Sequence, residues 1–260
     1  MSNQNNLTNV AESYLRTLVL GTEEELTNLV GENGYIDDPR EGSNVGAQEI
    51  NKFSRKFKDW LGDAELETEM LRITASDSRV CSEDILHIKR PNEYLQLPVA
   101  TVISSDTASG ANVVHVYYTQ WPFNKHHSVR PGLYSEPQTV APHSDVILKY
   151  FESLVSGDIE KTLECFEADI YFREASGPPY VHWGKYAVRQ YFLGLFGKGA
   201  PMLRDDTIID DGRCAVMEFT VVGWNGVKRE PNQYEAGLAV YQRSNDGLIS
   251  AIRIYDDVDF

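Results

Sequence analysis

The chain has 260 residues, 42% of them hydrophobic and 24% charged, and can bury the core of one large domain or of two ordinary ones. Its formal net charge of -15 argues against binding to nucleic acid or to an anionic membrane face, because both depend on clustered Lys and Arg. There is no apolar run of about 20 residues and no basic start before an apolar stretch, so we expect a soluble, cytoplasmic protein. Cys81, Cys165 and Cys214 are odd in number and widely spaced, which favours buried thiols over a disulfide framework or a metal site.

The two halves of the chain predict the same order of elements. Each opens with an amphipathic helix, followed by a short helix, a strand ending at a carboxylate, a third helix and a series of longer strands. In the first half these are expected near 10–19, 26–30, 35–38, 47–61, 66–73, 80–88, 94–103 and 113–120. In the second half they are expected near 146–155, 159–166, 171–174, 185–196, 207–209, 214–224, 234–242 and 249–255.

The halves also match residue by residue. Tyr14 and Tyr150 are separated by 136 residues, and the same offset separates Asp38 from Glu174. Past these carboxylates the offset becomes 138, as between Gly46 and Gly184, which a two-residue insertion explains. The offset between matching residues stays constant apart from one change of two residues, which favours duplication of one ancestral domain.

A stretch with four prolines and little periodicity, 122–143, separates the copies and predicts an extended linker. We therefore expect a first domain at 1–121 and a second at 144–260. Helices followed by a meander of strands indicate an α+β fold, with about three helices covering one face of a curved antiparallel sheet. The linker is long enough for the domains to dock as an intramolecular pseudo-dimer, and it leaves further homo-oligomers open.

One local pattern resembles a known family. Asp37-Asp38-Pro39 is followed by Val45-Gly46-x-x-x-Ile50-x-x-Phe53, which resembles the stretch around the catalytic base of ketosteroid isomerases and SnoaL-like cyclases. The segment 168–174, with Gly177-Pro178-Pro179 before Gly184, is similar but has glutamate for aspartate. The resemblance implies two cone-shaped domains of the nuclear-transport-factor-2-like superfamily, whose members differ widely in function.

Carried over by position, the resemblance implies that Asp38 and Glu174 are general bases and that Tyr14 and Tyr150 donate to a developing oxyanion. The protonated acid of ketosteroid isomerase has no counterpart, because its position falls on Ala239. The alternatives are structural. Asp38 before proline could cap a turn, Glu174 could be solvated or paired with a neighbouring arginine, and the tyrosines could be core residues.

Further site residues are predicted in the second half. If Ile252 and Ile254 point inward, Asp256 enters the mouth of the pocket as a second acid or base; otherwise it belongs to an exposed acidic terminus. Aromatic side chains could line a pocket for a flat, apolar ligand, or they could simply form the core. The substrate-binding residues predicted in this way are Phe172, Trp183, Phe192, Phe219 and Trp224.

The sequence predicts neither a metal site nor a cofactor. His126, His127 and His143 lack the spaced partners of a zinc site, and the glycine-rich run 194–199 lacks the order of a phosphate-binding loop. The leading hypothesis is a cofactor-independent acid/base enzyme, an isomerase, cyclase or dehydratase, on a small apolar, oxygenated ligand that can be polycyclic. The alternatives are an epoxide hydrolase of the polyether type and a small-molecule binding module without catalysis.

Overall fold

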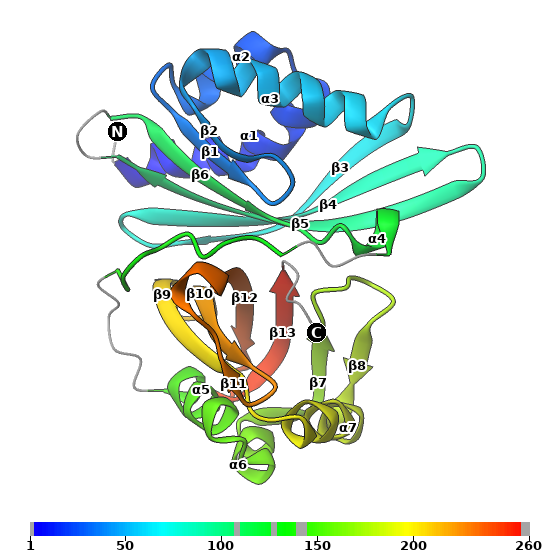
Figure 1. Cartoon of the computed structure of the whole chain (residues 1–260), viewed down its shortest axis with the longest axis vertical. Coiled ribbons are helices and arrows are strands. Elements are labelled where there is room, and N and C mark those ends of the chain that lie inside the picture. The colour runs from blue at the N-terminus through cyan, green and yellow to red at the C-terminus, as the bar shows by residue number, and fades with distance from the viewer. Residues whose placement is uncertain (1–2, 107–109, 126–128, 139–144, 256–260) are drawn as a thin grey trace. The chain divides into compact units, whose positions relative to one another are not determined.

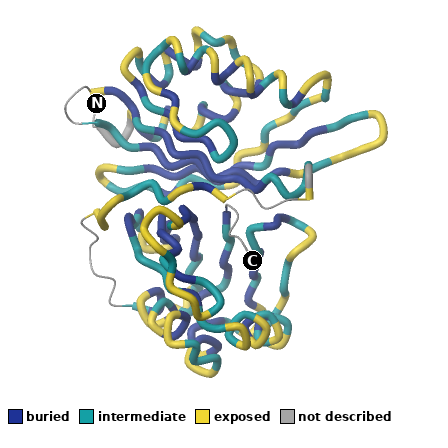
Figure 2. Tube along the Cα trace, in the orientation of Figure 1, coloured by how far each residue is buried: buried dark blue, intermediate teal, exposed yellow. Residues whose placement is uncertain are grey.

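The computed structural model describes residues 3–106, 110–125, 129–138 and 145–255, and Asp256, His126, His127 and His143 lie outside these ranges. The chain divides into two compact units, 1–125 and 126–260, each of which is described by itself. Each unit has its own hydrophobic core, which Figure 2 shows as dark runs along the central strands.

In the first unit three helices cover one face of a six-stranded sheet with the order β2-β1-β6-β5-β4-β3 (Figure 1). All neighbouring strands are antiparallel except β1 and β6, which run parallel. The helices are α1 (Asn3–Leu20), α2 (Glu23–Val30) and α3 (Gly46–Leu61), and a short α4 (Trp121–Asn124) follows the sheet. The strands are β1 (Tyr35–Asp38), β2 (Gly42–Val45), β3 (Glu65–Ala75), β4 (Arg79–Arg90), β5 (Glu93–Ser105) and β6 (Asn112–Tyr117).

The second unit repeats this plan. Its sheet has the order β11-β10-β12-β13-β7-β8, with β9 paired to β10, and only β13 and β7 run parallel. The helices are α5 (Val146–Ser156), α6 (Ile159–Glu164) and α7 (Gly184–Gly197). The strands are β7 (Phe166–Arg173), β8 (Val181–Trp183), β9 (Met202–Asp210), β10 (Cys214–Trp224), β11 (Val227–Lys228), β12 (Glu235–Arg243) and β13 (Ile249–Tyr255).

A glycine with positive φ opens the third helix of each unit. Gly46 has φ 78° and Gly184 has φ 74°, a left-handed conformation that other residues adopt only at a cost. A Cβ on Gly46 would face the carbonyl oxygen of Glu32 at 3.6 Å, and one on Gly184 would face that of Ala168 at 3.4 Å. Gly46 and Gly184 are related by the offset of 138, and Glu32 and Ala168 by the offset of 136. The backbone geometry at the start of the third helix is therefore the same in both units.

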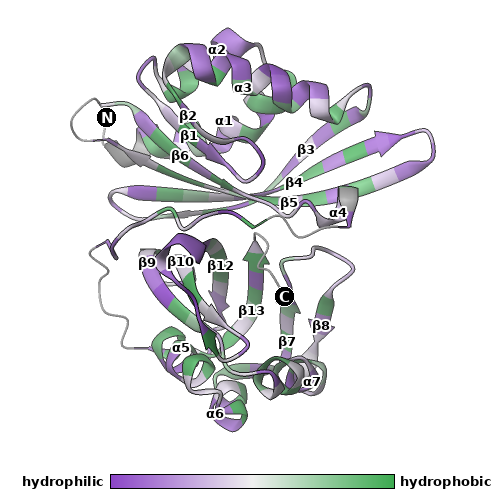
Figure 3. Cartoon of the chain, in the orientation of Figure 1, coloured by the Kyte–Doolittle hydropathy of each residue, from purple (hydrophilic) through white to green (hydrophobic). Residues whose placement is uncertain are grey.

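The expected fold class is confirmed, since both units are α+β with a curved, mainly antiparallel sheet and covering helices. Figure 3 shows hydrophobic and hydrophilic bands along the strands of both units. Several bounds shift by a few residues, and β9 is longer than expected. One residue changes element: α6 ends at Glu164, and Phe166, expected on that helix, begins β7 and is fully buried. The docking of the units as a pseudo-dimer stays a prediction.

Residues 122–125 of the predicted linker belong to the first unit, whereas residues 129–138 are bound to the second. Residues 130–132 run beside the start of β12, where the Gly132 amide donates to the Tyr234 carbonyl at 2.9 Å and the Ala236 amide donates to the Arg130 carbonyl at 2.9 Å. The Tyr134 hydroxyl donates to Glu218 at 2.8 Å. These hydrogen bonds attach residues 130–138 to the second unit.

Candidate functional site

A small apolar cavity of about 70 Å³ lies inside the second unit. It is lined by Tyr150 of α5, by Glu174 just after β7, and by apolar side chains from α7 and the strands. The remaining lining residues are Leu154, Phe172, Ala175, Tyr191, Phe192, Leu195, Pro201, Leu203, Phe219, Trp224 and Ile254. The structure thus brings the predicted pair Tyr150 and Glu174 to one cavity. Its volume is well below the roughly 300–1,000 Å³ of typical ligand pockets.

Glu174 is held by a histidine that sequence reasoning missed. The Nε2 atom of His182 lies 2.5 Å from Glu174 Oε1, while the two side chains keep 26% and 21% of their exposure. The hairpin explains the contact, because β8 pairs antiparallel with β7 and sets His182 directly opposite Phe172. With neutral histidine, the Nε2 hydrogen is donated to the carboxylate. Glu174 pairs with neither Arg173 nor Arg189, the latter of which bonds to Glu160.

Of the tyrosines that line the cavity, Tyr150 is buried and Tyr191 is partly buried. Burial raises the pKa of the Tyr150 hydroxyl well above its ordinary value, and the neighbouring Tyr241 and Tyr191 add to the rise. Burial also raises the pKa of Tyr191, and the charge of Glu174 contributes. Both hydroxyls therefore keep their protons near neutral pH and can act as hydrogen-bond donors.

The wall of the cavity at Phe219 depends on a glycine. Gly237 lies opposite Phe219 in the β10–β12 pair, and a Cβ there would come within 2.4 Å of the Phe219 ring. We expect Gly237→Ala to displace the ring, reduce the cavity and lower the unfolding free energy by about 1–3 kcal/mol. Chemical denaturation measures this loss, with Gly194→Ala as the control, because a Cβ at Gly194 meets nothing within 4 Å. Equal stability of both variants would contradict this account of the wall.

Of the five aromatic residues predicted to bind substrate, Phe172, Phe192, Phe219 and Trp224 line the cavity and Trp183 does not. Trp183 is 68% exposed and packs its ring edge-on against Tyr171 at 4.8 Å. The reason is strand alternation: Trp183 pairs with Tyr171, and both therefore point to the face opposite Phe172. An aromatic residue in an edge strand could not be assigned to a face before the hairpin register was known.

In the first unit Asp38 is fully buried and accepts several hydrogen bonds. The amides of Arg40 and Glu41 donate to Oδ1 at 2.9 and 3.0 Å, and the Tyr118 hydroxyl lies 3.0 Å from each carboxylate oxygen. The two amide bonds are those of a turn-capping aspartate. Tyr118 was missed by sequence reasoning, although the offset of 138 that relates Gly46 to Gly184 pairs it with Asp256.

Tyr14 is also fully buried, and its hydroxyl has no hydrogen-bond partner among the described residues. Burial raises its pKa well above the ordinary value, and the charge of Asp38 adds to the rise. The pKa of Tyr118 is raised by the same two causes, while Arg40 opposes them. The structure therefore places Tyr14 and Tyr118 close enough to Asp38 for its charge to raise the pKa of both hydroxyls.

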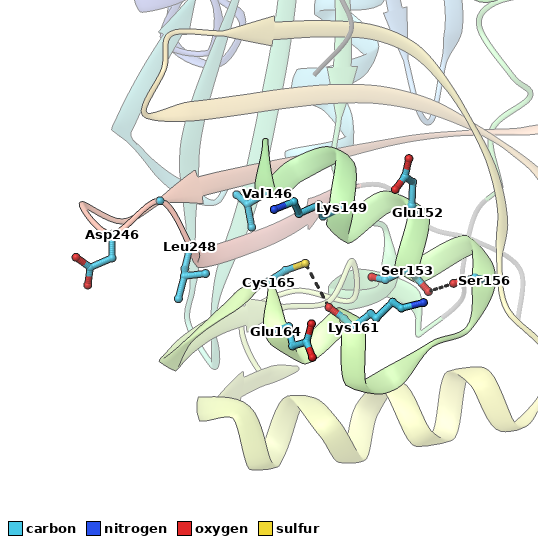
Figure 4. Close-up of a pocket in the computed structure, with 11 residues that line it drawn as sticks. Val146, Lys149, Glu152, Ser153, Ser156, Lys161, Glu164, Cys165, Asp246 and Leu248 are labelled. Carbon is cyan, nitrogen blue, oxygen red and sulfur yellow. Dashed lines mark hydrogen bonds between the residues drawn. The ribbon is translucent and has the colours of Figure 1, made fainter. Parts of the chain in front are cut away.

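A larger groove lies elsewhere on the second unit. It has a volume of about 710 Å³ and is formed by α5, α6 and the turn between β12 and β13 (Figure 4). Its charged residues are of both signs: Lys149, Lys161, Glu152, Glu164 and Asp246. It contains none of the predicted site residues, and the hydroxyls of Ser153 and Ser156 and the thiol of Cys165 each donate to a backbone carbonyl. The volume of a groove therefore does not by itself identify the candidate site.

The described residues include no group of three or more His, Cys, Asp or Glu side chains placed to hold a metal ion. None of the helices in the described ranges is long and apolar enough to cross a membrane.

Fold and cavity together define the class of the second unit, an α+β domain with an apolar interior and a carboxylate at its edge. Residues 147–252 match the family model described as the SnoaL-like domain. The match lies within the second unit; the first unit shares the order of strands and helices.

Among solved structures, the chain is similar to an NTF2-like protein of unknown function from Cytophaga hutchinsonii ATCC 33406, with 12% identity and a TM-score of 0.34. It is also similar to a proposed polyketide cyclase from Xanthomonas campestris pv. campestris, with 18% identity and a TM-score of 0.33. Each likeness covers 43% of this chain and 87% of the other. No curated protein gives a significant match to the sequence.

Proposed function

We propose that the second domain is a cofactor-independent acid/base enzyme for a small, apolar molecule that carries a carbonyl oxygen. The observation that carries the proposal is that Glu174 and Tyr150 line the same cavity, whose other walls are almost wholly apolar. The match of residues 147–252 to the SnoaL-like family model provides the family context.

In the proposed step Glu174 removes a proton from the carbon next to the carbonyl group. The electron pair of the C–H bond forms a C=C bond while the π pair of the C=O bond moves to the oxygen, and the Tyr150 hydroxyl donates a hydrogen bond to the resulting enolate. In a β,γ-unsaturated carbonyl compound, return of the proton from Glu174 to the γ-carbon gives an isomer. Attack of the enolate carbon on another carbonyl group of the same molecule gives a ring, and the new alkoxide oxygen takes the proton from Glu174. His182 positions Glu174 through its bond to Oε1, which leaves Oε2 as the oxygen that takes the proton.

The cavity volume restricts the substrate. About 70 Å³ suits only a very small molecule, and a polycyclic substrate requires the aromatic walls to move. Epoxide opening by paired acids would need a second carboxylic acid, for which the sequence offers Asp256, outside the described residues. We therefore favour proton transfer next to a carbonyl group.

Exchange of the α-hydrogens of cyclopentanone in D2O tests the proposal, because it needs only a base and an oxyanion donor. We expect the full chain to accelerate exchange, followed by proton NMR, well beyond the same concentration of acetate. Exchange at the acetate rate together with shifts of cavity resonances on adding ketone would support a binding module without catalysis. Exchange at that rate without such shifts would reject a carbonyl ligand altogether.

A further inference from the structure

Tyr191 of α7 lines the cavity of the second domain together with Tyr150 and Glu174. The centroid of its ring lies 4.7 Å from that of Phe172 and 5.1 Å from that of His182, the residue that holds Glu174. Two tyrosines, one from α5 and one from α7, therefore border the same small cavity as the carboxylate. The reaction proposed above uses only the tyrosine of α5.

The hydroxyl of Tyr191 is close to the other two functional groups of the cavity. Burial is the main cause of the raised pKa of Tyr191, and the charge of Glu174 adds to it. Burial likewise raises the pKa of Tyr150, and both Tyr241 and Tyr191 contribute to that rise. Electrostatic effects of this kind fall off with distance. The hydroxyl end of Tyr191, and not only its ring, therefore lies near the base and near the first donor.

The matching position of the first domain has a phenylalanine. The offset of 138 relates Tyr191 to Phe53, which is fully buried in the core of the first domain. A phenyl ring is therefore sufficient for packing at this point of the third helix. A buried hydroxyl group costs free energy unless it is hydrogen-bonded, so packing alone does not account for the tyrosine. In the second domain this hydroxyl accompanies the pair of Glu174 and His182.

We propose that Tyr191 is a second hydrogen-bond donor to the carbonyl oxygen of the substrate, beside Tyr150. A carbonyl oxygen has two lone pairs and can accept both bonds. The oxygen and the α-carbon of a ketone are both bonded to the carbonyl carbon, so a donor to the oxygen lies close to the base that removes the α-proton.

The proposed bond stabilises the enolate without changing the chemical step. It strengthens as charge moves onto the oxygen, and apolar walls increase this effect because they exclude water. The proton of Tyr191 stays on its hydroxyl, and no covalent bond to this residue forms or breaks. The catalytic role of Tyr191 rests on the function proposed for the second domain, whereas the contact with the oxygen can be tested without turnover.

Carbon-13 NMR of cyclopentanone labelled at its carbonyl carbon tests this contact. Hydrogen bonds to a ketone oxygen move the carbonyl resonance downfield, and titration with the full chain gives its position in bound ketone. With the wild-type chain we expect this position to lie downfield of that in cyclohexane. Tyr191→Phe and Tyr150→Phe should each move it back toward the cyclohexane value. Tyr186→Phe, on the same helix but 79% exposed, should leave it unchanged.

Exchange of the α-hydrogens of cyclopentanone in D2O measures the effect on catalysis. We expect Tyr191→Phe to lower the acceleration by about 10²–10³-fold, the usual result of removing one donor to an oxyanion. The variant is expected to fold, because the first domain packs a phenylalanine at this position, and circular dichroism checks the fold. Tyr186→Phe should exchange at the wild-type rate.

The two measurements distinguish the contact from the proposed function. A carbonyl shift that depends on Tyr191, in a wild-type chain that does not accelerate exchange, would reject the proposed function and support the contact. Slower exchange of Tyr191→Phe with an unchanged carbonyl shift would overturn the proposal, because Tyr191 would then act through His182 as a positioning residue. If the wild-type chain accelerates exchange, an unchanged rate in Tyr191→Phe would also overturn it.

Discussion

Replacing Glu174 with glutamine is expected to lower the acceleration of cyclopentanone exchange by about 10²–10⁴-fold, the usual contribution of a positioned general base. The change keeps the size of the side chain and removes its basic oxygen, so the cavity should persist. Tyr150→Phe should cause a loss of about 10²–10³-fold, because the enolate loses its proposed donor. Proton NMR of the exchange measures both variants, and circular dichroism checks that they fold.

Two controls separate chemistry from general damage. Glu152→Gln removes an exposed carboxylate from α5, and Tyr186→Phe alters a tyrosine that is 79% exposed, so neither should affect exchange. His182→Phe should lower the rate by less than Glu174→Gln, and His182→Gln should recover part of that loss because the amide can still donate to Glu174. Full acceleration by Glu174→Gln would remove this residue from the mechanism.

Replacing Asp38 with alanine is expected to lower the unfolding free energy of the first domain by roughly 2–5 kcal/mol. The substitution leaves the Tyr118 hydroxyl and the amides of Arg40 and Glu41 without their acceptor. Urea denaturation measures the loss. Hydrogen exchange by mass spectrometry assigns it, since protection should fall in β1 and β6 more than in the second domain.

Asp63→Ala is the matched control for this change, because Asp63 is exposed just after α3. Tyr118→Phe should cost about 1–3 kcal/mol, less than the loss of the whole carboxylate. A loss below about 1 kcal/mol for Asp38→Ala would show that its hydrogen bonds contribute little.

The two domains use equivalent positions differently. Position 38 of the first domain is a buried aspartate bound by backbone amides and Tyr118, whereas its counterpart Glu174 lies at a cavity and contacts His182. The offset of 138 relates His182 to Asn44, whose side chain donates to the Gly42 carbonyl at 2.8 Å. The two units therefore share a backbone plan, while the polar partners at matched positions differ.

Part of the candidate site could be predicted from the sequence. The internal repeat and the motif around Asp38 identified the tyrosine and carboxylate positions, and Tyr150 and Glu174 do line one cavity. His182 could not be found in this way. Its contact with Glu174 depends on which residues of β7 and β8 face each other, and this register is set by the geometry of the hairpin.

The sequence by itself determined the order of helices and strands, the repeat of the two halves and the α+β class. These follow from the periodicity of hydrophobic residues, from turn residues and from the constant offset between matching residues. The tertiary structure decided which side chains share an interior. Trp183 is a case in point, since its aromatic character suggested a pocket while its pairing with Tyr171 turned it to the outer face. Burial and hydrogen-bond satisfaction are properties of packed neighbours, and only the packed chain distinguishes a bound Asp38 from a cavity-lining Glu174.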